Sequence, residues 1–362
     1  MIDDGPELSA SRQAFLKATT RHTPFGYLDN PHHSAIMNRS GAIRSVPPLG
    51  FGFWCRALPW PYGDGALRRV NYLSFLHLSV NVDGISLHSS QDFREHGVAL
   101  VSKYHTKTMM SYDWVFAGLS FSAKYFLHSE HSLVCLLDIE NLGDTERTVT
   151  VHATNIYGWP QVRWWGSDGF VGGHNERIDA GVSKIWAYGD VFVIGANRPS
   201  TAHKSTTSEQ QWNRWIADND LSSNQGASDR WHEPMYTVQS YRLDIAPGKS
   251  ESMVICLTRG VNESLAARDH RQCLKTAASS LSRQLMADED FYRNTPLLTG
   301  DWPPTWKHGW IYDWETLRMN IRPPLGIYQH PWDGMQFFTP RQVLGETMLD
   351  TMCLSYADVD LA

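Results

Sequence analysis

The sequence has few cysteines, no long apolar run and no block of charge of one sign. Its five cysteines stand far apart and form no Cys-x-x-Cys pair, a pattern that favours reduced, buried thiols over a disulfide framework. No run of about 18 apolar residues occurs, so we expect no membrane-spanning helix. The N-terminus, Met1–Pro6, has neither a basic start nor an apolar stretch, so we expect no secretory signal. These absences together predict a cytoplasmic protein.

Signals for nucleic-acid, metal and nucleotide binding are also missing. The formal net charge of -6 argues against nucleic acid or an anionic membrane surface as a partner. The 16 histidines include no His-Glu-x-x-His motif, and His32-His33 has no carboxylate at a ligand spacing, so we predict no catalytic metal. There is no Gly-x-Ser-x-Gly elbow, no Walker A loop and no Gly-x-Gly-x-x-Gly after a strand, and we expect no cofactor.

Aromatic residues, by contrast, are plentiful. The 362 residues include 15 tryptophans, several of them in polar, glycine-rich stretches. The apolar C–H face of a sugar ring stacks on a flat aromatic ring, while its hydroxyls need polar partners such as Asp, Asn and Arg. This composition favours carbohydrate binding. The alternative, that any one tryptophan is an ordinary core residue, stays open because large aromatic side chains are mostly buried.

Residues 25–260 have the pattern of one large β domain, preceded by a polar arm at 1–24. Short alternating or apolar runs are separated by turn residues, as at Asp83-Gly84 and Asn141–Asp144. Leu119–Leu127 alternates clearly between apolar and polar residues. The number and spacing of these runs predict a large antiparallel sandwich of two sheets.

Two long polar segments interrupt the predicted strands, Gly158–Gly169 and Glu209–Pro234. Both carry tryptophans and few aliphatic residues, and long loops on a rigid scaffold often carry function. Within the first segment, Trp164 and Trp165 are candidate sugar-binding residues. An ordinary surface excursion is the alternative for both segments.

The hydrophobic period changes from two to about 3.6 after Gly260, which indicates a change from strands to helices. Asn262 is the predicted N-cap of a helix within a linker at 261–300. Apolar residues recur at steps of four or its multiples, at Leu265, Cys273, Ala277, Leu281 and Leu285. This stripe predicts an amphipathic helix that runs to about Tyr292.

Residues 301–362 are predicted to begin a second, helical domain. Pro303-Pro304 precede a helix over Thr305–Ile321, and a loop over Leu325–Phe338 follows it. Thr339 then caps another helix. Apolar residues lie on nearly all faces of this last helix, so we expect the helix to be buried on most sides.

The loop after the second helix contains Gly326–Gly334, with the sequence GIYQHPWDG. It resembles the Trp-Asp element between the first barrel helices of the inverting six-hairpin glycoside hydrolases, which include glucoamylase-like, trehalase-like and processing α-glucosidase-like enzymes. The order of sandwich, linker helix and paired helices is similar to theirs, and the stretch Val134–Val151 resembles a strand pair common in the sandwiches of sugar enzymes. The resemblance implies a supersandwich followed by a linker helix and an (α/α)6 barrel, with an oligosaccharide as substrate.

The resemblance also implies where a sugar would bind. Trp332 and Asp333 would lie at the sugar-binding end of the barrel, where Asp333 accepts hydrogen bonds from two sugar hydroxyls beside the Trp332 ring. The alternative for Asp333 is a plain Asp-Gly turn. The loop that carries Trp164 and Trp165 is expected to reach the same rim.

A complete barrel of this kind needs twelve helices, roughly 350 residues, and residues 301–362 hold only the first of them. In these families the general acid and base lie on later barrel loops, so both are expected beyond Ala362 and remain unknown.

The local carboxylates are Asp313, Glu315, Asp333, Glu346 and Asp350. Glu346 and Asp350 share one helix face, whereas inverting enzymes hold their pair about 6.5–9.5 Å apart across the scissile bond. We therefore expect the N-terminal part of an inverting α-glucosidic hydrolase, with the barrel incomplete.

Other functions stay open. One is a non-catalytic carbohydrate-binding sandwich whose helices serve as a docking element. Another is a phosphorylase or lyase of similar architecture, although lyases usually place the barrel before the sandwich and a phosphorylase needs a phosphate site that the sequence does not reveal. The nucleotide sequence beyond Ala362 separates the first of these from the hydrolase. A long helical continuation favours the hydrolase, and a stop codon favours the binding module.

The purified 362-residue chain should not hydrolyse glycosides, because an open set of helices lacks the catalytic carboxylate pair. Glucose release from maltose or an aryl glucoside, followed by a coupled oxidase assay, should stay at the buffer background. Robust turnover of any glucoside would contradict this expectation. Uncovered apolar helix faces should also make the chain associate, which light scattering measures.

Overall fold

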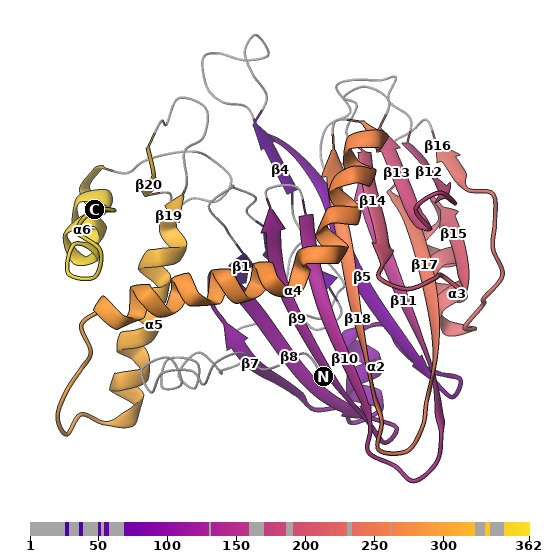
Figure 1. The fold of residues 1–362 in the computed structure, drawn as a ribbon, viewed down its shortest axis with the longest axis horizontal. Helices are drawn as coiled ribbons and strands as arrows, with labels where there is room; N and C mark the ends of the chain where they lie inside the picture. Colours follow the sequence, from indigo (N-terminus) through magenta and orange to yellow (C-terminus); the bar gives the residue numbers. More distant parts are fainter. Residues whose placement is uncertain are drawn as a thin grey trace.

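Strands form the first part of the molecule and helices the last part (Figure 1). The computed structural model describes residues 26–28, 36–38, 50–51, 54–57, 69–129, 132–158, 170–185, 191–229, 234–260, 262–322, 330–333 and 344–362. The predicted order of an antiparallel β-sandwich followed by helices is confirmed within these ranges. The polar arm at 1–24 lies outside them.

The larger sheet has nine strands in the order β16-β12-β13-β14-β18-β10-β9-β8-β7, and its neighbouring strands are antiparallel. These strands are β7 (Leu100–His105), β8 (Met109–Phe116), β9 (Leu119–Ser129), β10 (Ser132–Asn141), β12 (Phe170–Asn175), β13 (Ala180–Ile185), β14 (Val191–Ala196), β16 (Ala227–Asp229) and β18 (Ser250–Gly260).

The second sheet has seven strands, with β15-β17-β11-β5-β3 as its main order and β4 and β6 paired to β5. These strands are β3 (Gly50–Phe51), β4 (Trp54–Ala57), β5 (Arg69–Val82), β6 (Ile85–Leu87), β11 (Arg147–Gly158), β15 (Ala202–Thr206) and β17 (Met235–Ile245). A separate pair is formed by β1 (Gly26–Leu28) and β2 (Ile36–Asn38).

The main core lies between the two sheets and follows from the alternation of side chains along each strand. On β5 the apolar residues Leu76, Leu78, Val80 and Val82 point inward and are almost fully buried. The intervening residues of the same strand are polar and lie on the outer face of the sheet. At the end of β5, Asp83 and Gly84 have φ angles of 49° and 90°, which confirms the predicted tight hairpin turn into β6.

The outer face of the nine-stranded sheet is covered by α4 (Glu263–Asn294), the predicted linker helix. The Asn262 side chain accepts a hydrogen bond from the Leu265 backbone N–H at 2.9 Å, as expected for the cap. The predicted stripe is largely correct, since Cys273 is buried, whereas Leu265 is only half-buried and Ala266 faces the sheet in its place. The Cys273 Sγ lies 2.7 Å from the Sγ of Cys256 on β18. The apolar contacts beneath the helix involve Met109, Phe126, Val134, Leu136, Ala277 and Leu281.

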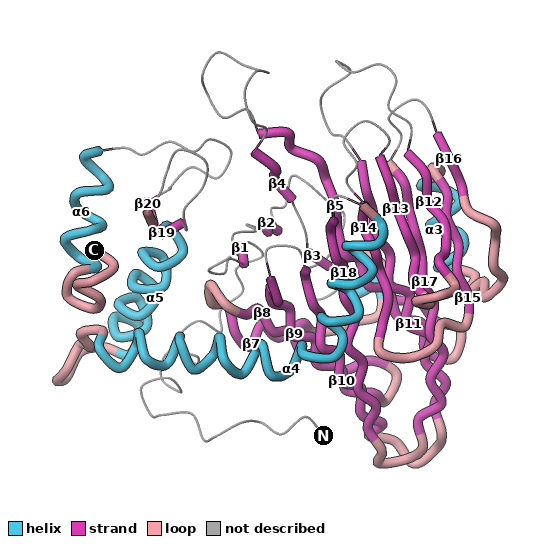
Figure 2. Tube along the Cα trace, turned by 45° about the horizontal axis from the view of Figure 1, so that its top comes forward, coloured by secondary structure: helices cyan, strands magenta, loops and turns pink. Residues whose placement is uncertain are grey.

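Helix α4 bends as it leaves the sheet (Figures 1 and 2). Side-chain hydroxyls in its middle bond to backbone carbonyls of the preceding turn. Thr276 donates to Gln272 at 2.9 Å, Ser279 to Thr276 at 3.0 Å and Ser282 to Ala278 at 3.1 Å. Such bonds compete with the helical ladder and favour bending. The second half of α4 therefore extends beyond the sandwich towards the last helices.

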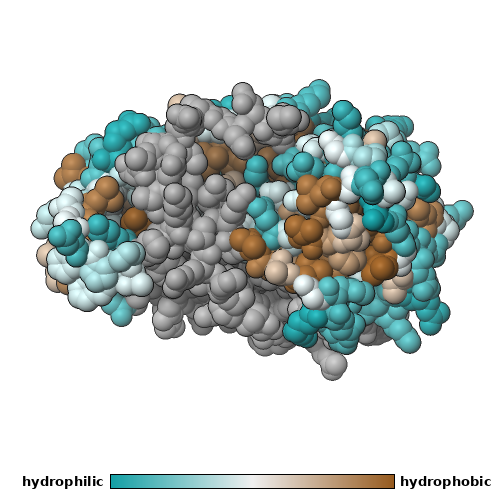
Figure 3. Space-filling view, turned by 90° about the horizontal axis from the view of Figure 1, so that it is seen from below, coloured by the Kyte–Doolittle hydropathy of each residue, from teal (hydrophilic) through white to brown (hydrophobic). Residues whose placement is uncertain are grey.

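The last helices are α5 (Pro304–Asn320) and α6 (Leu344–Leu354), which contact one another. A small core forms where α5 meets the end of α4 and the chain after α6, with Tyr292, Ile311, Trp314 and Ala357 as its buried members. The last helix is not buried on most sides, whereas the uncovered apolar faces that we expect of an incomplete barrel are present. Leu354 is its buried residue, whereas seven large apolar side chains on or after it are exposed, among them Val359 and Leu361, and apolar atoms are visible at this end of the surface, on the left of Figure 3. The other five are Leu344, Met348, Leu349, Met352 and Tyr356. The predicted cap at Thr339 lies outside the described residues.

A short helix begins the segment Glu209–Pro234, which we had predicted to be a loop. Ser208 accepts a hydrogen bond from the Gln211 backbone N–H at 3.2 Å and caps α3 (Glu209–Ala217). Trp212 and Ile216 are four residues apart and therefore share one helix face. They are buried against the outer face of the seven-stranded sheet, so the tryptophan is part of a small core rather than a surface platform.

Replacement of Gly260 by Ala should destabilise the protein by about 1–3 kcal/mol, because overpacking at a backbone contact cannot relax easily. A Cβ at Gly260 would lie 2.8 Å from the Ala266 backbone nitrogen, at the point where β18 passes into α4. The matched control is Gly173→Ala on β12, where nothing lies within 4 Å of the added carbon. Urea denaturation measures both variants, and equal midpoints for the two would contradict the prediction.

Candidate functional site

The predicted Trp-Asp segment forms a short strand at the end of α5. β19 (Ile321–Arg322) follows α5 directly and pairs antiparallel with β20 (Trp332–Asp333), so that Ile321 lies opposite Asp333. Trp332 is 6% exposed and Asp333 is 3% exposed. Both side chains are therefore shielded from solvent. That they line a sugar-binding cavity stays a prediction.

The sandwich holds this strand pair in place through Lys107, which lies in the turn between β7 and β8. The Lys107 Nζ donates to the carbonyl oxygens of Arg318, at 2.9 Å, and Ile321, at 2.7 Å. These carbonyls lie at the end of α5, where an ammonium group is favoured by the negative end of the helix dipole. Because Ile321 lies opposite Asp333, Lys107 also fixes where Asp333 lies relative to the sandwich.

A buried ionic cluster centred on Arg318 lies next to this contact. The guanidinium of Arg318 is 2.6 Å from an oxygen of Asp288 and 3.1 Å from an oxygen of Glu315. Asp288 also accepts a hydrogen bond from the Thr108 hydroxyl at 2.6 Å. Glu315 accepts hydrogen bonds from the Tyr292 hydroxyl and from the backbone of the β7–β8 turn. The cluster therefore joins the sandwich, α4 and α5.

The charges in this Arg318 cluster compensate one another. Burial by itself would lower the pKa of the Arg318 guanidinium, but the carboxylates of Asp288 and Glu315 hold that pKa well above its ordinary value. Burial, and after it the Glu315 carboxylate, raise the pKa of the Tyr292 hydroxyl well above its ordinary value. Both groups keep their protons at neutral pH. The cluster is thus suited to hold three elements together rather than to exchange protons with a substrate.

The other candidates from the sequence lie apart from this cluster. Trp164 and Trp165 lie outside the described residues, so their approach to the barrel rim stays a prediction. Asp313 and Glu346 are exposed, and the Asp350 carboxylate is 3.5 Å from the Asn320 amide nitrogen. Of the acidic residues after position 300, Glu315 and Asp333 are the buried ones.

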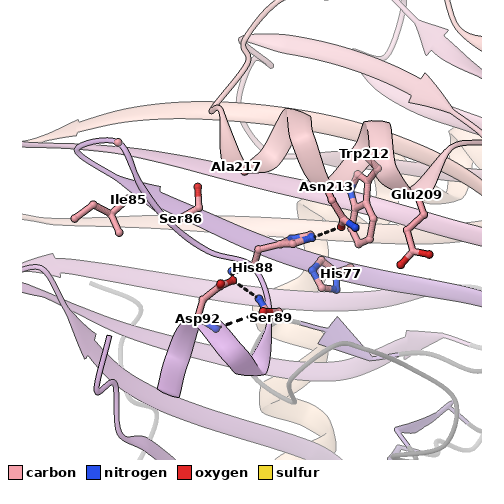
Figure 4. A pocket seen from close by; sticks show the side chains of 11 residues that line it. His77, Ile85, Ser86, His88, Ser89, Asp92, Glu209, Trp212, Asn213 and Ala217 are labelled. Carbon is pink, nitrogen blue, oxygen red and sulfur yellow. Dashed lines mark hydrogen bonds between the residues drawn. The ribbon is translucent and has the colours of Figure 1, made fainter. Parts of the chain in front are cut away.

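A cavity that we did not predict from the sequence lies on the outer face of the seven-stranded sheet. It measures about 510 Å³ and lies between α3 and the segment His88–Asp92, with His77 of β5 on the sheet side (Figure 4). The His77 ring centroid is 5.0 Å from that of His88 and 5.1 Å from that of Trp212. The signal for it was the alternation along β5, which places His77, Ser79 and Asn81 on the face opposite the core.

The second histidine of this cavity is held from both sides. The His88 Nδ1 lies 2.7 Å from the Ser79 hydroxyl, and its Nε2 lies 2.9 Å from the side-chain oxygen of Asn213. The His88 backbone N–H donates to the Asp92 carboxylate at 2.8 Å, at the start of α2 (Ser90–Glu95). Burial lowers the pKa of His88, and burial followed by the His88 ring lowers the pKa of His77 well below its ordinary value. Both imidazoles are therefore neutral at pH 7.

Within the described ranges, no three His, Cys, Asp or Glu side chains are grouped so that they could hold a metal ion. None of the helices in those ranges has both the length and the apolar character needed to cross a membrane.

Neither a sequence-family model nor a curated protein matches the chain. Among solved structures it is similar to a "Putative kojibiose phosphorylase from human microbiome", with a TM-score of 0.46 and 9% identity over 86% of this chain and 40% of that one. A bacterial glucoamylase complexed with acarbose gives a TM-score of 0.44 and 9% identity over 76% of this chain and 40% of that one. The chain thus spans about two fifths of the length of either protein. These likenesses are too distant to assign a function.

Replacement of Arg318 by Met should destabilise the packing of α4, α5 and the β7–β8 turn by about 3–5 kcal/mol, because Asp288 and Glu315 would remain buried without their counter-charge. Amide hydrogen exchange along α5 should accelerate, and the midpoint of urea denaturation should fall.

The matched control is Arg293→Met, whose ion pair with Asp290 is largely exposed and 3.0 Å long. Its effect on the free energy of unfolding should stay below about 1 kcal/mol. If the two variants lost similar stability, the Arg318 cluster would not be what attaches the helices to the sandwich.

Proposed function

We propose that the chain is the N-terminal part of a six-hairpin glycoside hydrolase that acts on an α-glucosidic oligosaccharide with inversion. Residues 25–260 form the sandwich domain, 261–300 link it to the barrel, and 301–362 begin the catalytic domain. In this proposal α5 and α6 are the first barrel helices. The general acid and base lie on further helices that these residues do not include.

The arrangement of the last three helices is the observation that carries the proposal. α4 lies on the sandwich, bends and extends past the sheet, and the Arg318 cluster attaches α5 to it. α6 then contacts α5 and leaves apolar side chains such as Leu344, Met348 and Met352 exposed. A ring of paired helices would cover such a face, because each helix packs between neighbours.

Trp332 and Asp333 lie in the connection between α5 and α6, where the sugar-binding end of such a barrel would form. We assign Asp333 the role of accepting hydrogen bonds from two sugar hydroxyls, and Trp332 that of contacting the apolar face of the ring. Their shielding from solvent supports these roles, since a hydrogen bond is stronger where water does not compete for the carboxylate. Trp164 and Trp165 are assigned to the same rim on the sequence alone.

The competing functions lead to different products. A hydrolase releases the free sugar, whereas a phosphorylase consumes inorganic phosphate and releases a sugar phosphate. A non-catalytic binding module turns nothing over.

The test uses the longest open reading frame that contains this chain, assayed on α-linked glucose disaccharides with and without phosphate. Phosphate-independent release of glucose, with the β-anomer appearing first by NMR, supports the proposal. A strict requirement for phosphate, or no turnover at all, contradicts it.

In that longer protein, replacement of Asp333 by Asn should lower kcat/KM on an α-glucoside about a hundredfold. Hydrogen bonds from two sugar hydroxyls to a charged carboxylate contribute on the order of 3 kcal/mol to transition-state binding. Initial rates measure the effect, and a thermal melt shows whether the variant is folded.

Asp313→Asn is the matched control, since it makes the same chemical change at an exposed position on α5. It should leave kcat/KM unaltered. An Asp333→Asn variant with full activity and unchanged melting temperature would remove Asp333 from the site and leave it as the Asp-Gly turn.

A further inference from the structure

The cavity beside α3 is separate from the proposed sugar site of the barrel. It lies on the outer face of the seven-stranded sheet, whereas α4 packs on β14, β18, β10 and β9 of the other sheet. Its volume of about 510 Å³ falls within the range of small-molecule sites, roughly 300–1,000 Å³. In Figure 4 the side chains of α3 and of the segment His88–Asp92 approach it from two sides, with His77 between them.

His77 is the buried polar group that lines this cavity without a partner. It is 2% exposed, and neither ring nitrogen makes a hydrogen bond of good geometry with the described residues. The backbone of His88 acts to raise the pKa of His77, but burial and the His88 ring outweigh it, so the ring stays neutral. A neutral imidazole carries one N–H donor and one acceptor nitrogen, and leaving both unpaired in a buried place is unfavourable. Ligand hydroxyls, which donate as well as accept, complement both.

The remaining polar groups of the cavity disfavour an anion. Asp92 and Glu209 line it, and the described lining residues include no Lys or Arg. In the cap of α2, Asp92 uses its Oδ2, which leaves Oδ1 outside that cap. The Asn213 oxygen faces the His88 ring, so its amide N–H groups are directed elsewhere. Carboxylate acceptors beside amide and imidazole donors form the pattern that a set of hydroxyl groups satisfies.

The aromatic ring of the cavity does not provide a stacking platform. Trp212 is 4% exposed, and its ring stacks on Tyr236 with centroids 4.7 Å apart. Its indole N–H donates to the Thr154 hydroxyl at 3.2 Å. Recognition in this cavity therefore rests on hydrogen bonds, which predicts weak binding, with a Kd on the order of millimolar.

We propose that the cavity between α3 and the segment His88–Asp92 binds a neutral, hydroxyl-rich ligand of the sugar class. The rival is an organic cation, which Asp92 and Glu209 would attract. A cation without O–H or N–H groups offers no donor to the acceptor nitrogen of the His77 ring and would leave that nitrogen unpaired. The site does not depend on the proposed hydrolase function, because it lies on the other outer face of the sandwich and involves neither Trp332 nor Asp333.

The probe is maltose, titrated onto the complete 362-residue chain and followed by saturation-transfer NMR. The expected result is saturable binding in the millimolar range. The His77→Phe variant keeps a flat ring but removes both ring nitrogens, and it should weaken binding at least tenfold. The matched control is His96→Phe, which makes the same change at an exposed histidine outside the cavity lining and should bind as the parent chain does.

A second variant covers the case in which His77→Phe does not fold, and a second ligand tests the cation as the rival occupant. If His77→Phe fails to fold, as judged by circular dichroism and melting, Asn213→Ala at an exposed position of α3 carries the test and should weaken binding several-fold. Tetramethylammonium, a cation without hydroxyls, is the cationic probe, with Glu209→Gln as its variant. The proposal is overturned by the absence of saturable maltose binding to the folded chain. It is equally overturned by unchanged maltose affinity in the folded variants, or by tetramethylammonium binding that exceeds that of maltose and is lost in Glu209→Gln.

Discussion

The buried pairing of Arg318 with Asp288 and Glu315 is the interaction on which the position of the later helices depends. A charged group loses several kcal/mol of hydration on burial, so each of these charges is tolerated only while its partners are in place. Asp288 lies on α4 and Glu315 on α5, and the helices therefore cannot slide past one another without separating charges. Apolar contacts alone, such as those of Ile311 and Trp314, would tolerate small shifts by repacking.

The sandwich takes part in the same arrangement through one turn. Thr108 binds Asp288, and Lys107 binds the carbonyls at the end of α5. The β7–β8 turn therefore positions the strand pair β19–β20 relative to the sandwich. The bend of α4 makes this possible. Its first half packs on the sheet through contacts such as that of Cys273, its second half turns away from the sheet, and Asp288 in that second half bonds to Thr108 of the turn. The bend of α4 and the β7–β8 turn thus together set the position of α5 and of the strand pair that carries Asp333.

Sequence patterns predicted the fold well wherever a local rule acted alone. The alternation of strand residues, the Asp-Gly hairpin and the Asn262 cap each depend on neighbours within a few positions, and the change from strands to helices follows from them. The candidate sites depend on distant partners. Thr108 meets Asp288 across 180 positions, and the cavity appears only when α3 packs on β5. Periodicity likewise shows that the last helix has apolar faces, but it does not show which neighbour covers them. The polar composition around Trp212 concealed the spacing that makes α3 a helix.

The contact between Cys256 and Cys273 makes the detachment of α4 from the sheet measurable through the reactivity of two thiols. Both thiols are buried, one on β18 and one on α4, with their Sγ atoms 2.7 Å apart. A thiol reagent reaches them only when the helix leaves the sheet, which is an opening event of the native state. Cys353 is exposed in the same molecule and is open to the reagent without any such opening, which makes it an internal reference. The ratio of the alkylation rates therefore reports the fraction of time that α4 spends away from the sandwich, without any added label.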